Sequence, residues 1–189
     1  NVTEKEAKEQ SYFLLSFQPV INVLQCDEFV NAAMTGWLVE IRNYGTCRLK
    51  DVSLDNSTQF TVRFVSIHNS GSLQIYLDSL NTKPYKIIPA RSTPKGWDFI
   101  TVTIDPIPGK RNLYFKYVNP SIKPEHENGI LMEWFRFSQP FPGKGKSGYK
   151  DVKVLFDSLM YAKPETTPVM IENNSGMMRP THIFERGNW

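Results

Sequence analysis

Long apolar runs and a strong charge imbalance are both missing from this chain. No stretch approaches the roughly 18 consecutive apolar residues of a membrane-spanning helix, so the sequence predicts no membrane span. The 22 Lys and Arg residues are matched by 19 Asp and Glu residues, which leaves a net charge of +3, and no long basic run occurs. Nucleic acid is therefore not expected as a partner.

Cysteine and histidine are scarce, and their spacing suits no common reactive site. Cys26 and Cys47 do not form a CxxC pair, and the three histidines lie far apart without an HxxxH motif. A zinc site, a thioredoxin-type site and a catalytic triad therefore have little support, and the lack of CxxCH excludes haem attachment in this segment. The two cysteines form one disulfide or stay buried as thiols, and composition does not decide between these states.

Carboxylates also fail to form a pattern typical of an enzyme. The one adjacent pair, Asp27 and Glu28, lies on an expected strand, where neighbouring side chains point to opposite faces. Such a pair is poorly placed for the acid and base steps of glycoside hydrolysis. We therefore expect a protein without catalysis.

Aromatic residues, proline and glycine are plentiful and spread along the chain. Aromatics make up 13% of the residues, and there are 13 prolines and 11 glycines. Between turn residues, apolar and polar side chains alternate with a period of two, as in strands with one buried face. The alternating segments are 37–43, 60–64, 73–77, 99–104, 113–117 and 130–137. This pattern predicts an all-β fold, an antiparallel β-sandwich of the jelly-roll type.

The two ends of the chain differ from this middle part. Thr3 and Glu6 fit a capping box, which predicts a short N-terminal helix over residues 3–15. Residues 152–160 carry apolar side chains at helical spacing, and an irregular C-terminal extension follows residue 164. We expect an N-terminal helix and linker (1–22), a sandwich (23–138), and a linker with a short helix that leads into a following domain (139–189). The start without Met or signal peptide suggests a processed or excised piece.

Trp37 and Trp97 are the candidate binding residues. Trp37 follows a Thr-Gly pair at the start of a strand, and Trp97 lies in a turn before another strand. Either residue alone is as well explained as part of the core. Side by side at one end of a sandwich, the two rings would offer a stacking surface for the apolar face of a sugar. Trp134, inside the last strand, is expected in the core.

The order of short motifs along residues 23–138 resembles that of the family 6 carbohydrate-binding modules. The motifs, in chain order, are QCDE (25–28), GW (36–37), FTVR (60–63), GSLQIYLD (71–78), KGW (95–97), NLYF (112–115) and EWFRF (133–137). Each is weak alone, and the order and spacing carry the resemblance. It implies a β-sandwich that binds a polysaccharide or oligosaccharide.

This resemblance also implies particular site residues. Two aromatic rings would enclose the sugar at Trp37 and Trp97, and Asn128 would form a hydrogen bond with it. The family usually has a second Asn where this chain has Leu131. A structural calcium ion would use Gln25 and Asp27, although calcium prefers about six to eight oxygen ligands.

The C-terminal tail carries a second resemblance. Its RPTHIFERGNW string, residues 179–189, looks like the opening of a planctomycete-type domain of unknown function. That domain follows cytochrome c-like domains in large exported proteins, so haem is expected elsewhere in the parent chain. The resemblance implies a bacterial protein that is periplasmic, on the cell surface or secreted.

Together these features predict a non-catalytic module that targets an exported multidomain protein to a glycan. The alternative is a structural sandwich that has lost sugar binding. Such a sandwich would pack against neighbouring domains or a partner chain.

Overall fold

The computed structural model describes residues 21–122, 127–141 and 143–161. The helix expected over residues 3–15 and the irregular extension beyond residue 164 lie outside these ranges. The elements are β1 (Ile21–Asn22), the 3-10 helix η1 (Val23–Gln25), β2 (Cys26–Thr35), β3 (Leu38–Ser53), β4 (Gln59–Val65), β5 (Ser72–Leu77), β6 (Lys86–Pro89), β7 (Asp98–Thr103), β8 (Lys110–Val118), β9 (Asn128–Ser138) and α2 (Tyr149–Tyr161).

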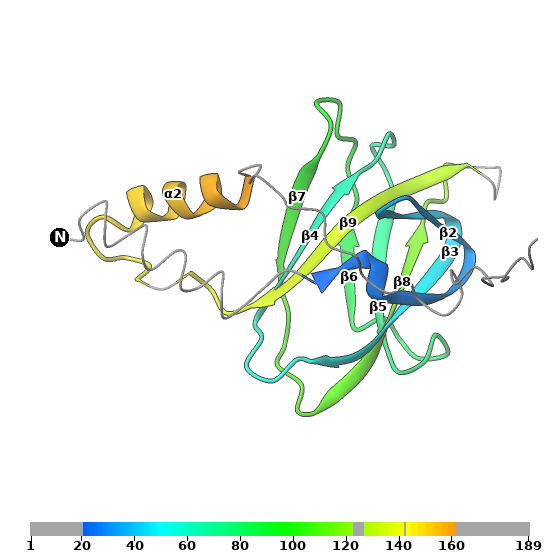
Figure 1. Cartoon of the computed structure of the whole chain (residues 1–189), viewed down its shortest axis with the longest axis horizontal. Helices are drawn as coiled ribbons and strands as arrows, with labels where there is room; N and C mark the ends of the chain where they lie inside the picture. The colour runs from blue at the N-terminus through cyan, green and yellow to red at the C-terminus, as the bar shows by residue number, and fades with distance from the viewer. Residues whose placement is uncertain (1–20, 123–126, 142, 162–189) are drawn as a thin grey trace, which may run out of the picture.

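The strands form one strongly curved antiparallel sheet that folds into two layers (Figure 1). Its main path has the order β6-β5-β8-β3-β9-β4-β7, while β1 pairs with β9 and β2 pairs with β3. Strand β3 is 16 residues long and joins the layers, because residues 39–42 pair with β9 and residues 46–53 pair with β8. The predicted all-β antiparallel sandwich is confirmed.

The core lies between these layers and is rich in aromatic side chains. Phe115 of β8 and Phe135 of β9 stack with 4.4 Å between their ring centroids, and Phe60 of β4 packs against both. All three are fully buried. Their neighbours along each strand point outward, as the period-two alternation predicted.

Trp134 is an exception to the predicted core. The pairing of β4 with β9 shifts between Arg63, which faces Trp134, and Phe64, which faces Met132. The extra residue in β9 is Glu133, so Glu133 and Trp134 both lie on the outer side and Trp134 is only half-buried. The prediction of a core tryptophan is therefore wrong, because a β-bulge interrupts the alternation.

The two cysteines are reduced and fully buried thiols. A hydrogen bond with Cys26, together with burial, raises the pKa of the Cys47 thiol well above its usual value. The buried-thiol alternative is therefore the one that the structure contains.

The helix expected near residues 152–160 is present as α2. It lies beside the β7 edge of the sheet and projects away from the sandwich (Figure 1). Val152 and Phe156 are buried at one helical turn's spacing, which confirms the predicted period. Within the part of the chain that the structure describes, no helix is long and apolar enough to cross a membrane.

Candidate functional site

Trp37 and Trp97 lie on opposite sides of two intervening strands. Trp37 is on the turn between β2 and β3 and is 64% exposed, whereas Trp97 is half-buried directly before β7. Pairing aligns one row of residues across the sheet, namely Val39, Met132, Phe64 and Asp98. Because β3 and β7 run in opposite directions, the two tryptophans are offset by about 10 Å along the strands and about 14 Å across them. The backbone positions of the two tryptophans are therefore separated by two strands.

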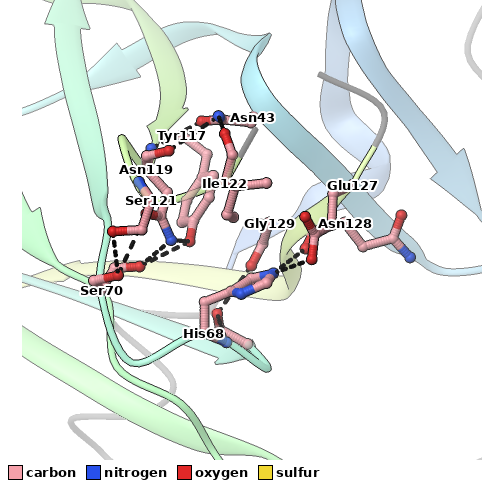
Figure 2. A network of polar contacts seen from close by, with 11 residues as sticks. Asn43, His68, Ser70, Tyr117, Asn119, Ser121, Ile122, Glu127, Asn128 and Gly129 are labelled. Carbon is pink, nitrogen blue, oxygen red and sulfur yellow. Dashed lines mark hydrogen bonds and ion pairs between the residues drawn. The ribbon is translucent and has the colours of Figure 1, made fainter. Parts of the chain in front are cut away.

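Asn128 lies apart from both tryptophans. It is the first residue of β9, where it pairs with Arg42 of β3. Leu131, three residues further along β9, pairs with Val65 of β4. Its backbone carbonyl accepts a hydrogen bond from His68 Nε2 at 3.1 Å, and its side chain points away from that contact (Figure 2).

A different set of side chains converges on the outer face of β9, β4 and β7. These strands turn their apolar residues to the core, so the intervening residues line up in rows on the outside. We call this surface the outer strip. It contains three paired rows, Trp134–Arg63–Phe99, Arg136–Thr61–Thr101 and Ser138–Gln59–Thr103, and it is continued by Trp97 at one end.

The Trp97 end of the outer strip combines aromatic rings with an ion pair. The Arg63 guanidinium lies 4.9 Å from the centre of the Trp97 ring and forms an ion pair with Glu133. The rings of Phe99 and Trp134 pack beside it, with 5.2 Å between their centroids. A cation over one indole face stabilises the orientation of the ring, so an apolar group can stack only on the other face.

The opposite end of the strip is polar and cationic. The hydroxyls of Thr61 and Thr101 lie 2.9 Å apart, and the Arg136 side chain lies over the Phe156 ring of α2 at 5.0 Å. Arg136 is only 4% exposed, and burial lowers the pKa of its guanidinium. A cleft of about 710 Å³ separates this end of the strip from α2.

Sequence reasoning missed Arg63, Glu133 and Arg136 as candidates. Alternation placed Arg63 on the outer face of its strand, but it does not say which strands are neighbours. The bulge at Glu133 has no sequence signal of its own. Charged and aromatic residues at outward positions of several strands were the available hint.

The expected calcium ligands have other partners. Asp27 accepts hydrogen bonds from Arg48 Nε at 2.8 Å and Nη2 at 3.0 Å, and Lys50 Nζ lies 2.7 Å away. These cations, Arg48 first, hold the pKa of Asp27 below its usual value. Gln25 is exposed at the end of η1, and the described residues contain no group of three or more His, Cys, Asp or Glu that suits a metal. The residues at this edge therefore do not fit a calcium ion.

Calcium is expected to leave the thermal stability unchanged. A ligand that binds only the native state stabilises it, and the melting temperature rises with the logarithm of the free ligand concentration above the dissociation constant. Because two cations already neutralise Asp27, the melting temperature should be the same in millimolar calcium chloride and in EDTA, measured by calorimetry. A melting temperature that rises steadily with free calcium would overturn this expectation.

A buried hydrogen-bond network fixes residues 119–122, directly after β8 (Figure 2). Asn43 is 1% exposed, and its Nδ2 donates to the carbonyls of Asn119 and Ile122, both at 3.0 Å. Its Oδ1 accepts from the Asn119 backbone N–H at 2.8 Å. Gly129 packs close to the Tyr117 ring, where an added Cβ would lie 2.2 Å from Cδ1. The network ties residues 119–122 to β3.

Asn43→Ala should lower the free energy of unfolding by about 3 kcal/mol, because it leaves buried backbone groups without partners. Urea denaturation measures this loss. Asn81→Ala is the matched control, since Asn81 is exposed, and should change stability by less than about 0.5 kcal/mol. A loss below about 1 kcal/mol for Asn43→Ala would show that water replaces these bonds.

Comparison with known proteins identifies a shared fold. No family model matches the chain, and no curated protein matches it. CsCBM6-3 from Clostridium stercorarium, solved in complex with cellobiose, has a TM-score of 0.53 at 18% identity over 64% of this chain and 92% of that one. A family 6 carbohydrate-binding module from Clostridium cellulolyticum, in complex with xylose, has a TM-score of 0.53 at 18% identity over 64% and 96%. A β-1,3-glucan-binding module from Bacillus halodurans has 0.54 at 14% over 64% and 95%. The chain therefore has the fold of the family 6 carbohydrate-binding modules.

Proposed function

We propose that this protein is a non-catalytic carbohydrate-binding module that binds glycan on the outer strip at Trp97. The observation that carries the proposal is the Trp97 ring, oriented by Arg63 beside the Phe99–Trp134 pair. Support comes from the fold, since the similar structures are described with cellobiose, with xylose, or as binding β-1,3-glucan.

The chemistry of the strip suits a sugar. A sugar ring presents an apolar face of C–H groups, which packs on an aromatic face, while its hydroxyls form hydrogen bonds at the edges. Arg63 and Glu133 offer donors and acceptors beside the Trp97 ring. Burying a side chain of this size is worth about 2–3 kcal/mol, and a surface that leaves several aromatic rings partly open is typical of a binding site.

The proposal changes the polar half of the site that the sequence implied. Leu131, which stands where the resemblance expects Asn, pairs with Val65 of β4, and its side chain has no hydrogen-bonding group. In our proposal the Arg63–Glu133 pair takes over that role. Trp37 and Asn128 then lie outside the site centred on Trp97.

We propose further that the module targets an exported bacterial protein, periplasmic, on the cell surface or secreted, to a glycan. The tail motif at residues 179–189 supports this context. Residues 139–189 would lead into the following domain of the parent chain.

A glycan array probed with the 189-residue chain tests the proposal, followed by isothermal titration calorimetry on each positive glycan. We expect binding to at least one oligosaccharide with saturable heat. Heat-denatured protein is the control for non-specific adsorption. A blank array together with flat titrations against cello-, xylo- and β-1,3-gluco-oligosaccharides would reject carbohydrate binding.

The second candidate is an interaction module that packs neighbouring domains or a partner chain. The observation that favours it is that two strands separate Trp37 from Trp97, the two aromatic residues of the implied sugar site. Trp37 at 64% exposed and Val154 at 68% exposed are apolar side chains that such contacts would cover. Retained stability without any glycan binding distinguishes this candidate.

A further inference from the structure

The cleft between α2 and the outer strip has the size of a small-ligand site. Its volume is about 710 Å³, within the range of about 300–1,000 Å³ for such sites. Ring contacts anchor one wall, because Phe141 packs against Phe156 at 4.9 Å and against Tyr149 at 6.0 Å. Phe99 forms part of the opposite wall on β7.

Positive charge dominates this cleft. The lining contains Arg136, Lys144 and Lys153, and the one carboxylate among the described lining residues is Asp157. Lys153 Nζ lies 2.6 Å from Asp157 Oδ2, so this carboxylate is already paired within α2. Arg136 is nearly buried, and an anion that reached it would be partly desolvated. Charge-assisted hydrogen bonds are strongest in such surroundings.

Hydroxyl groups complete the lining, from Thr61, Thr101, Thr103, Ser138 and Tyr149. They suit a polyhydroxylated ligand better than a purely apolar one. The cleft is also continuous with the Trp97 end of the strip, because Phe99 lines the cleft and packs against Trp134. Thr101 of β7 lies four positions after Trp97, a span of about 13 Å that a short oligosaccharide can bridge.

We propose that this cleft is a subsite for the acidic group of a carboxylated or sulfated sugar, next to the Trp97 surface. The proposal rests on carbohydrate binding by the outer strip and names the class of glycan. Arg136 and Lys144 would contact the anionic group, and the hydroxyl-bearing residues would contact the sugar that carries it.

Calorimetry with the full chain tests the subsite by comparing the affinity for an acidic oligosaccharide with the affinity for a neutral one. Trigalacturonate is the carboxylated probe, a carrageenan oligosaccharide is the sulfated probe, and cellotriose is the neutral one. We expect at least one acidic probe to bind roughly tenfold more tightly than cellotriose, with an advantage that shrinks as sodium chloride is added. The two acidic probes show which group the subsite takes.

Lys144→Glu should reduce the acidic preference, which is the affinity for the acidic probe divided by the affinity for cellotriose, to near one. Lys146→Glu is the matched control, because Lys146 is exposed on the same loop, carries the same charge and is not part of the lining. Arg136→Gln should have the same effect as Lys144→Glu, with its melting temperature measured to verify folding. The preference should survive in Lys146→Glu.

Three outcomes would overturn the subsite. Equal affinity for acidic and neutral probes would reject the subsite and still support carbohydrate binding by the outer strip. An equal loss of preference in Lys144→Glu and Lys146→Glu shows overall charge rather than a site. Failure of all probes to bind rejects carbohydrate binding and the subsite together.

Discussion

Trp97→Ala should abolish measurable glycan binding while the fold stays intact. Trp97 is half-buried, and its ring is oriented by the Arg63 guanidinium at 4.9 Å rather than enclosed by the core. Removing a central aromatic of a binding surface commonly costs about 2 kcal/mol or more, which weakens affinity roughly 30-fold. Calorimetry against the best glycan from the array measures the loss, and thermal unfolding of the same variant verifies the fold.

Trp37→Ala is the matched control for this experiment. Trp37 is the more exposed tryptophan, and two strands separate it from Trp97, so its removal should leave the glycan affinity within about twofold. Equal losses in both variants would mean that the two rings act together, as the sequence implied. If Trp97→Ala instead lowers the free energy of unfolding by about 3–5 kcal/mol, Trp97 is a core residue. The interaction module would then be the better-supported hypothesis.

Phe115→Ala should lower the free energy of unfolding by about 3–5 kcal/mol. Phe115 is fully buried and stacks on Phe135 at 4.4 Å, and Phe60 packs on both rings. Its removal leaves a cavity at the contact between the two layers. Because a domain has only about 5–15 kcal/mol of stability, this loss is a large part of the total.

Urea denaturation at constant pH measures the effect of Phe115→Ala. Ile87→Ala in β6 is the matched control, because Ile87 is 54% exposed and its loss should cost less than about 1 kcal/mol. A loss below about 2 kcal/mol for Phe115→Ala would show that the neighbouring rings collapse into the space.

Six of the strands, β3, β4, β5, β7, β8 and β9, could be predicted because each carries its own alternating segment. In β4, Phe60, Val62 and Phe64 are buried while Arg63 between them is only half-buried. This alternation follows from the pleat of a single strand and needs no knowledge of its neighbours. The same local logic located α2 from the 3.6-residue period of its apolar side chains.

The candidate site could be predicted only in part. Trp97 was identified from its turn, and it lies at one end of the outer strip. Its partners Arg63 and Glu133 come from β4 and β9, and a bulge in β9 puts Glu133 and Trp134 on the outer face. A contact between strands depends on their order and register, which are properties of the whole sheet.

The sequence by itself determined the all-β class, the positions of six strands and the C-terminal helical segment of this protein, because side-chain periodicity is a local property of the backbone. Only the tertiary structure decided that two strands separate Trp37 from Trp97, that Asp27 pairs with two cations, and that α2 forms a cationic cleft with the sheet. Each of these depends on residues far apart in the chain, which meet because long-range strand pairing and burial of the shared core set their positions.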